Sequence, residues 1–425
     1  MWQKIQQVWG TKEVRNKLLF VGAMLVIYRL IAHIPLPGVN IANVRQLLEG
    51  NQILGLLNVF SGGSIQNFSV IMLGVGPYIT ASIIVQLLTM IIPSFEELTK
   101  EGESGQQKIS MYTRYLTVPF ALLQSFAMIQ YLNRSSLPII TDVSPLHIVT
   151  IMLTITAGTM FLVWLGELIT EQKVGNGTSL LIFAGIVAAL PSALRNAFIN
   201  YTPDDLTTFV LFGALAILTI VGVVFINEGQ RNIPVTYAKQ VRGTRMQGGS
   251  TTHLPFRVNM AGVVPIIFAL SLITLPAIIA QFFVASTTPW LASFAVKVVN
   301  AFQSTGVVYN LIYFILVFGF TYFYTAVIFH PQKIAENIQK QGGFIPGIRP
   351  GKETENYLGA TMNRLNLIGA TFLGVIAVLP LIVQGIAGSQ NLRIGGTSLL
   401  IAVAVAIETA KQIDAQITMH EYDRV

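Results

Sequence analysis

Long apolar segments alternate with polar connections over the whole length of the chain. A helix needs about 20 consecutive apolar residues to span a bilayer, and ten segments come close to this length. They are residues 18–34, 70–92, 115–132, 146–169, 178–199, 206–226, 260–284, 307–329, 365–387 and 395–413. The pattern predicts an all-α polytopic membrane protein with ten transmembrane helices.

The composition agrees with this fold class. Of the 425 residues, 53% are hydrophobic and only 11% are charged, whereas a soluble protein carries about 25% charged residues. The chain contains no cysteine, which excludes a disulfide framework and any thiolate chemistry. The net charge of +7 is compatible with nucleic-acid binding, but the charges lie between apolar segments, where they more commonly set membrane topology.

The basic residues predict the orientation in the membrane. An even number of spans places both termini on one side. The connections on that side contain 20 Lys and Arg residues, and those on the other side contain five. Because loops rich in Lys and Arg stay in the cytoplasm, we expect both termini to be cytoplasmic. Residues 1–17 are polar and lack the pattern of a cleavable signal peptide.

Two internal repeats relate the first part of the chain to the second. Residues 177–182 and 396–401 both read GTSLLI, and GVGPYI at 74–79 resembles GVVPII at 262–267. In a ten-span topology the two members of each pair cross the membrane in opposite directions. We therefore expect two inverted five-helix halves, residues 1–200 and 201–425, related by a pseudo-two-fold axis in the membrane plane.

One apolar segment, residues 53–60, is too short to cross the membrane. It is followed by Ser61, Gly62, Gly63 and Ser64, which end it. One interpretation is an interfacial loop helix. The other is a re-entrant half-helix, which is tolerated at membrane depth only when it is buried in protein. The pattern alone leaves both interpretations open.

Two cytoplasmic connections, residues 228–259 and 330–364, are unusually long and carry five basic residues each. Membrane topology accounts for their charge but not for their length, so we expect them to contact a cytoplasmic partner. Residues 342–351 of the second connection read GGFIPGIRPG. Glycine and proline at this density predict a defined turn that presents Arg349, rather than a helix.

The chain lacks the common catalytic and nucleotide-binding motifs, and its five histidines show no metal-ligand spacing. We expect no catalytic residues, no metal and no cofactor. A secondary transporter is a rival interpretation because it shares the inverted repeat. Such a transporter commonly carries an ionisable residue inside a span, and none is evident here. A membrane-embedded enzyme or insertase is a third class with little support.

Isoleucines occupy matched positions in the repeats. The matched positions, with two more isoleucines one helical turn further along, are Ile79, Ile83, Ile182, Ile186, Ile267 and Ile401. Any single isoleucine in a span is more simply explained by contact with lipid. Four symmetry-matched isoleucines near a pseudo-axis instead predict a narrow apolar ring, which dewets and blocks ions. Such a ring has no chemical selectivity, which suits a passenger of varying side chains, namely a polypeptide.

Several local motifs together resemble the SecY family of protein-conducting channels over essentially the whole chain. They are KEGESG at 100–105 with YTRY at 112–115, PYI at 77–79 with ASI at 81–83, THLP at 252–255 with NMAG at 259–262, PGIRPG at 346–351, and GGTSLLI at 395–401. Each motif is weak alone, and their combination in this order is specific.

The resemblance implies a set of roles. The six isoleucines would form the pore ring, and the short segment would be a re-entrant plug that includes Asn58, Val59, Phe60, Ser61, Gly62, Gly63 and Ser64. Spans 2 and 3 against spans 7 and 8 would form a lateral gate, with Gln86, Gln124 and Asn259 as candidate polar contacts. The basic loops would dock the motor ATPase SecA or the ribosome through Arg349, Lys239, Arg242 and Arg245.

The same resemblance implies the setting of the protein. The chain would be the central pore-forming subunit of a translocase in the bacterial plasma membrane, together with SecE and SecG subunits. It would pass unfolded secretory precursors across the bilayer and release transmembrane segments sideways. Signal sequences would bind at the gate, and the channel itself would catalyse no reaction.

Overall fold

A computed structural model gives the architecture of the chain. It describes residues 9–50, 58, 61–133, 138–140, 144–199, 206–237, 240–242, 245–247, 251–284, 288–302, 306–387 and 396–422. Helices dominate these residues, and five short strands lie between α10 and α15. The predicted fold class is therefore confirmed as mostly helical.

Each of the ten predicted apolar segments overlaps a helix. These helices are α2 (Lys12–Ile31), α5 (Gly76–Ile91), α7 (Glu103–Asn133), α8 (Pro145–Glu171), α9 (Gly177–Ile199), α10 (Leu206–Glu228), α11 (Val264–Val284), α13 (Val307–Ile328), α15 (Lys352–Ala387) and α16 (Gly396–Tyr422). In the connections, the described residues also form α3 (Ile41–Gly50), α6 (Pro93–Lys100), α12 (Pro289–Ala301) and α14 (Pro331–Lys340).

Not every one of these helices can cross a membrane by itself. Among the described residues, four helical stretches are long and apolar enough, and α5 with α6 makes a fifth if this pair, bent by 98°, is one span. The bend has a local cause. Ile92 precedes Pro93 and is extended, with φ −103° and ψ 116°, because the proline ring disfavours a helical conformation in the preceding residue.

The second and seventh predicted segments begin several residues before the helices that form there. Their helices, α5 and α11, begin only at Gly76 and Val264. Two residues before each start lies a glycine in the left-handed region, Gly74 with φ +58° and Gly262 with φ +64°. Glycine adopts this conformation readily, whereas a continuing helix cannot. The two copies of the weaker repeat thus enter their helices in the same way.

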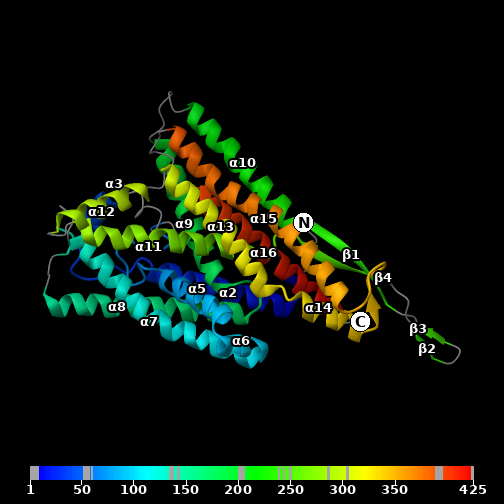
Figure 1. Cartoon of the computed structure of the whole chain (residues 1–425). Coiled ribbons are helices and arrows are strands. Elements are labelled where there is room, and N and C mark those ends of the chain that lie inside the picture. Colours follow the sequence, from blue (N-terminus) through cyan, green and yellow to red (C-terminus); the bar gives the residue numbers. More distant parts are fainter. Residues whose placement is uncertain are drawn as a thin grey trace.

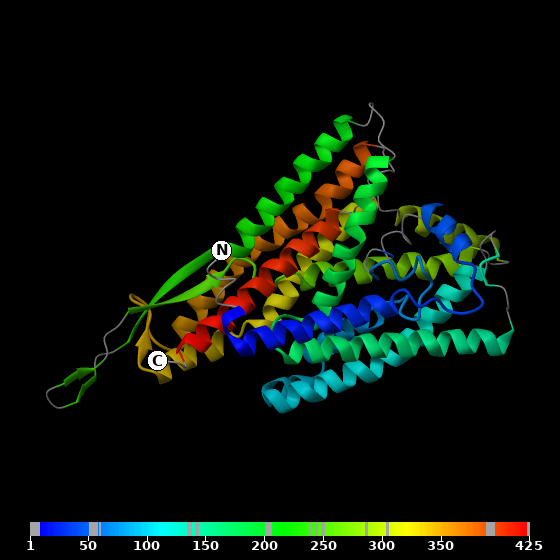
Figure 2. The ribbon, with the colours of Figure 1, turned by 180° about the vertical axis from the view of Figure 1, so that it is seen from behind.

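The long connections and the chain ends gather at one end of the molecule. Helix α2 begins there and α16 ends there, beside α14, β1 and β4 (Figure 1). The view from behind shows the same arrangement, with the β2–β3 hairpin projecting furthest from the helices (Figure 2). Helices α3 and α12 lie at the opposite end (Figure 1). This arrangement agrees with a topology in which both termini and both long loops share one side.

The first long connection is a β-hairpin, which the sequence analysis did not predict. Strand β1 (Gln230–Tyr237) pairs antiparallel with β4 (Thr251–Arg257), and β5 (Gly343–Phe344) of the second connection pairs with the other edge of β1. Strands β2 (Gln240–Arg242) and β3 (Arg245–Gln247) form a separate pair. Ile233 and Val235 are buried, whereas Asn232 and Pro234 are exposed and Thr236 is partly exposed; this period of two is typical of a strand.

Buried side chains form three hydrophobic clusters. The largest, called here the central cluster, joins α2, α5, α8, α9, α10, α11, α13, α15 and α16. A second joins α3 and residues 65–72 to the neighbouring ends of α7 and α8. A third joins β1 and β4 to α14 and the start of α15. The two long connections therefore pack on each other as one folded unit.

Candidate functional site

The six predicted ring isoleucines come from four helices. Ile79 and Ile83 lie on α5, Ile182 and Ile186 on α9, Ile267 on α11, and Ile401 on α16. The exposed fraction of each of these residues is at most 7%. All six belong to the central cluster, so the structure brings together side chains that are up to 322 positions apart in the sequence.

The residues after the short apolar segment form a compact turn. Of the predicted plug, Asn58 and 61–64 are described, and Val59 and Phe60 lie outside the described residues. Backbone N–H groups of Gly63 and Gln66 donate to the backbone and side-chain oxygens of Asn58, at 2.7 and 2.8 Å. The Ser64 hydroxyl donates to the Ser61 carbonyl at 2.7 Å. We call residues 61–64 the plug turn.

The plug turn packs against α2 and α9. The Tyr28 hydroxyl donates to the Ser61 carbonyl at 3.2 Å, and an Arg29 guanidinium nitrogen donates to the Gly62 carbonyl at 2.6 Å. Gly62 also lies against Gly185 of α9, which is flanked by the central cluster. Ser61, Gly62 and Ser64 of the turn are therefore buried in protein, and Gly63 is partly exposed.

Among the described residues, no hydrogen bond joins any two of the three predicted gate residues. Gln86 on α5 donates to Ser82 of the same helix at 3.1 Å. Gln124 on α7 lies near Gly76, the first residue of α5. Asn259 is buried, and its side-chain nitrogen donates to Asn227 of α10 at 2.7 Å.

Asn259 also shapes the entry to α11. Its side-chain nitrogen donates to the Gly262 carbonyl at 3.2 Å, and its side-chain oxygen accepts from the Gly262 N–H at 3.0 Å. This double contact closes the turn in which Gly262 takes its left-handed conformation. Asn259 therefore joins the end of α10 to the start of α11, and α11 in turn packs against both α5 and α7.

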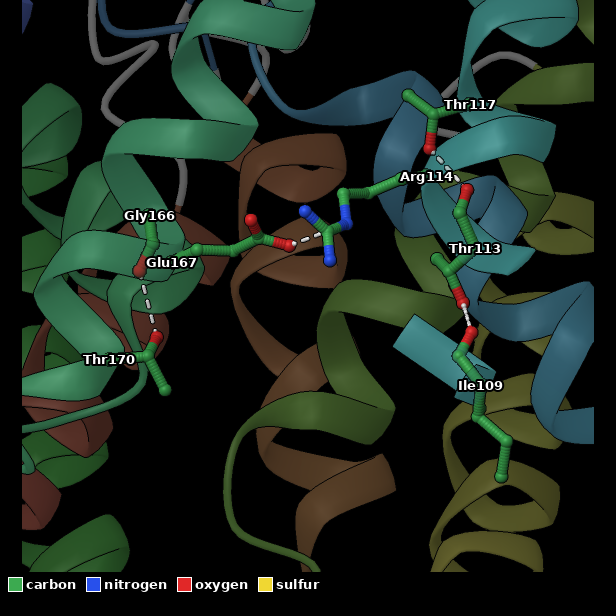
Figure 3. A network of polar contacts seen from close by, with 7 residues as sticks. All are labelled: Ile109, Thr113, Arg114, Thr117, Gly166, Glu167 and Thr170. Carbon is green, nitrogen blue, oxygen red and sulfur yellow. Dashed lines mark hydrogen bonds and ion pairs between the residues drawn. The ribbon is translucent and has the colours of Figure 1, made fainter. Parts of the chain in front are cut away.

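An ion pair between α7 and α8 was not singled out from the sequence. Arg114 Nε lies 3.3 Å from a Glu167 carboxylate oxygen, and both side chains are partly exposed. Figure 3 shows the guanidinium pointing across to the carboxylate between the two helices. Thr113, Thr117 and Thr170 around the pair donate to backbone carbonyls of their own helices. The pair therefore ties a predicted gate helix to its neighbour, which no linear motif reveals.

Arg349 lies in the predicted turn, and this prediction is confirmed. The Ile348 N–H donates to the Ile345 carbonyl at 3.0 Å, and Gly347 has φ +84°, as in a type II turn with proline at its second position and glycine at its third. Arg349 is exposed. It lines a shallow depression of about 580 Å³ with Glu353, Asn356 and Tyr357.

Two of the other three predicted docking residues belong to the tip of the hairpin. Arg242 in β2 lies opposite Arg245 in β3, whereas Lys239 lies outside the described residues. The tip stands well away from the helices in both views (Figures 1 and 2). Within the described ranges, no three His, Asp or Glu side chains group in a way that could hold a metal ion.

Comparisons with known proteins agree with this architecture. The family model described as SecY matches residues 69–410. Protein translocase subunit SecY of Mycobacterium tuberculosis (strain ATCC 25618 / H37Rv) is 45% identical over 430 residues, which covers 97% of each chain. The subunit of the same name from Thermotoga maritima is 42% identical over 432 residues, with 100% of this chain and 97% of the relative covered.

Solved structures share the fold at low sequence identity. A structure described as a protein conducting channel covers 93% of this chain and 91% of its own, with a TM-score of 0.59 and 17% identity. A SecY structure described in terms of its plug domain covers the same shares, with a TM-score of 0.62 and 19% identity. Canine Sec61 from a ribosome-channel complex gives a TM-score of 0.53 at 16% identity, with 93% and 91% covered.

The family match spans most of the chain, and the relatives match it from end to end at more than 40% identity. The helical architecture and the apolar centre agree with both findings. The chain therefore belongs to the SecY family, the protein-conducting channels of the Sec translocase, and it is a multi-pass membrane transport protein rather than an enzyme.

Proposed function

We propose that polypeptides cross this channel through the ring of six isoleucines and that the plug turn closes the ring at rest. The observation that carries the proposal is the burial of all six isoleucines in the central cluster, with the plug turn packed on α9 beside two of them. An apolar constriction holds no water column and therefore blocks ions. It also makes no specific contact with a passing chain, so it tolerates any side chain.

The lateral gate would lie between α5 and α7 on one side and α11 and α13 on the other. Helix α11 packs against both α5 and α7, so an opening here would separate helices that carry ring isoleucines. The apolar core of a signal sequence prefers lipid to a wet passage. Its entry between these helices would widen the ring and release the plug turn, and transmembrane segments would leave sideways by the same route.

The basic connections would receive the partner that drives transport. Arg349 is exposed on a fixed turn, and the hairpin carries Arg242 and Arg245 at its tip. We propose SecA as the motor and the ribosome as an alternative partner, with SecE and SecG as companion subunits. The ribosome has support in the folds of canine Sec61 and yeast Ssh1, whose solved structures are described as complexes with ribosomes.

We place the protein in the bacterial plasma membrane with both termini in the cytoplasm. The excess of Lys and Arg on one side of the predicted topology supports this orientation. The start of α2, the end of α16 and the basic hairpin share one end of the molecule (Figure 1), as the proposal requires. The two inverted halves would then be residues 1–200 and 201–425.

The test is reconstitution of the chain in liposomes with a SecE-type subunit, followed by addition of SecA, ATP and a secretory precursor. We expect the precursor to become protected from external protease only when ATP is present. A parallel sample with a known channel shows whether the motor is active. Loss of protection in this chain alone would reject the proposed passage through the ring.

A further inference from the structure

We infer that Arg29 of α2 and Gly185 of α9 form a seat that holds the plug turn in the closed channel. The inference rests on the proposed sealing role of the plug turn, and it adds the residues that set its position. Arg29 acts by a hydrogen bond to the backbone of the turn, and Gly185 acts by leaving room for that backbone. The two residues lie 156 positions apart in the sequence.

The bond from Arg29 is the shortest hydrogen bond of the plug turn among the described residues. Its guanidinium nitrogen lies 2.6 Å from the Gly62 carbonyl oxygen, and a hydrogen bond from a charged donor is stronger than one between neutral groups. The ion pairs of the described residues include none with Arg29. The carbonyl of the turn is therefore an acceptor that stabilises this charge near the end of a predicted span, and release of the turn would take that acceptor away.

Gly185 allows the turn to touch the helix itself. A Cβ atom at Gly185 would lie 2.7 Å from the Cα of Gly62 and 3.1 Å from its backbone nitrogen. A Cβ at Gly62 would likewise lie 2.7 Å from the Cα of Gly185. Real Cβ atoms do not approach backbone this closely, so any side chain at position 185 requires the turn to move. Gly62 is further restricted to glycine by its φ of +68°.

Tyr28 closes the seat between these two contacts. It is 3% exposed, and its hydroxyl donates to the Ser61 carbonyl at 3.2 Å. The same hydroxyl oxygen would lie 3.0 Å from a Cβ at Gly185. The turn thus presents two successive carbonyls to two successive residues of α2, which fixes both its distance and its orientation. Packing of apolar side chains alone would not fix that orientation.

The inner ring and the seat use different residues of α9, which makes them separable by mutation. Ile182 and Ile186 belong to the ring, and Gly185 lies between them in the sequence. Substitution of Gly185 by alanine leaves the isoleucines unchanged and raises helix propensity. The matched control is Gly22→Ala on α2, because a Cβ at Gly22 meets no atom within 4 Å.

The test uses a cysteine in the plug turn as a reporter. The chain has no natural cysteine, so Ser64→Cys gives a single thiol at a position that is 0% exposed. The channel is reconstituted with its companion subunits in liposomes without precursor. We then measure the labelling rate by a membrane-impermeant maleimide and the leak of ions through the same vesicles. The variants carried on this background are Gly185→Ala, Arg29→Met, Arg29→Lys and Gly22→Ala.

Arg29→Met is expected to raise the labelling rate about tenfold or more, since a hydrogen bond to a charged group is among the stronger polar contacts. Gly185→Ala is expected to raise it as well, because a Cβ 2.7 Å from the Cα of Gly62 displaces the turn. Arg29→Lys keeps a charged donor and is expected to restore part of the protection, and Gly22→Ala is expected to label like the parent. Labelling at the parental rate in Gly185→Ala or Arg29→Met would overturn the seat. Retained ATP-driven export shows that each variant is folded.

The ion leak separates the seat from the proposed function. Faster labelling with a greater leak supports both. Faster labelling without a leak leaves the seat standing and rejects the sealing role of the plug turn. Parental labelling together with a leak in the ring variant Ile182→Gly rejects the seat and leaves the proposed ring intact.

Discussion

Helices α9 and α16 begin with the same six residues and are then used differently. In both, the serine, the second leucine and the isoleucine of GTSLLI are buried, with Ile182 at 2% and Ile401 at 0% exposed. Three residues after the isoleucine, α9 has Gly185 and α16 has Ala404. The plug turn rests on Gly185, whereas Ala404 packs in the central cluster. The repeat thus keeps the same buried residues in both halves. It differs at the position where α9 needs glycine to leave room for the plug turn.

The weaker repeat also gives α5 and α11 the same entry to the helix, although different segments precede them. In both helices an N–H four residues on donates to the matched carbonyl, Ile79 to Val75 at 3.0 Å and Ile267 to Val263 at 3.3 Å. Before α5 the chain forms the plug turn, and before α11 it forms the basic hairpin. The shared helix entry agrees with two related halves. The first half carries the proposed seal, and the second carries the proposed docking surface.

The largest effect is expected when the ring is widened by a substitution in one half at a time, which tests whether the two halves contribute equally. Ile182→Gly and Ile401→Gly remove large apolar side chains from matched positions, so water can enter the constriction. We expect each variant to leak ions at rest while still exporting a precursor, and the double variant to leak more. Single-channel conductance in planar bilayers measures the effect, which we expect to be about tenfold or more over the parent.

A matched control separates the ring from helix weakening. Val187 on α9 is 40% exposed, and Val187→Gly lowers helix propensity by about 0.3–0.5 kcal/mol without enlarging the ring. We expect this variant to conduct like the parent. A leak from Ile182→Gly without one from Ile401→Gly would contradict an equal contribution of the two halves.

The next prediction concerns the docking surface of the second half. Arg349→Glu reverses an exposed charge directly after the turn formed by residues 345–348. Like charges brought together at an interface cost several kcal/mol, so we expect SecA-driven export to fall by about tenfold or more. Arg45→Glu, an equal change at an exposed position of α3 at the opposite end of the molecule, is the control. Equal export by the two variants would remove Arg349 from the docking surface.

The sequence predicted those parts of the molecule that depend on local patterns. The ten helices follow from apolar length, and the turn before Arg349 follows from Pro346 and Gly347. The roles of the ring and plug came from the repeats and from family resemblance. The helix bend at Ile92 was missed, although Pro93 was a readable signal. The β1–β4 hairpin was also missed because its alternation is confined to a few residues.

The contacts between distant residues could not be read from the sequence. Nothing in a linear pattern places the guanidinium of Arg29 on the carbonyl of Gly62, or Gly185 against the same residue. Asn259 was predicted as a gate contact, and its neighbours Asn227 and Gly262 emerge only from the fold. These contacts depend on how helices pack, which the sequence determines only through the whole structure.

A smaller effect is expected at the entry to α11. Asn259→Leu leaves Asn227 without its side-chain partner and opens the turn at Gly262. Polar contacts within membranes contribute about 0.6–2 kcal/mol, so the gate equilibrium should shift by several-fold. Export of precursors with defective signal sequences measures this shift. If the Asn227 contact carries the effect, Asn227→Leu acts alike and the double variant adds little; additive effects would assign Asn259 a separate role.

The smallest effect is expected at the ion pair between α7 and α8. Arg114 and Glu167 are partly exposed, and such pairs contribute about 0.2–1 kcal/mol. Because the pair joins a proposed gate helix of the first half to its neighbour, Arg114→Glu should slightly favour gate opening, and the exchange Arg114→Glu with Glu167→Arg should restore the parent. The same exchange at Lys100 and Glu96, a pair within α6, is the control, because it joins no two helices. Equal signal-sequence stringency in Arg114→Glu and the parent would show that the gate does not depend on this pair.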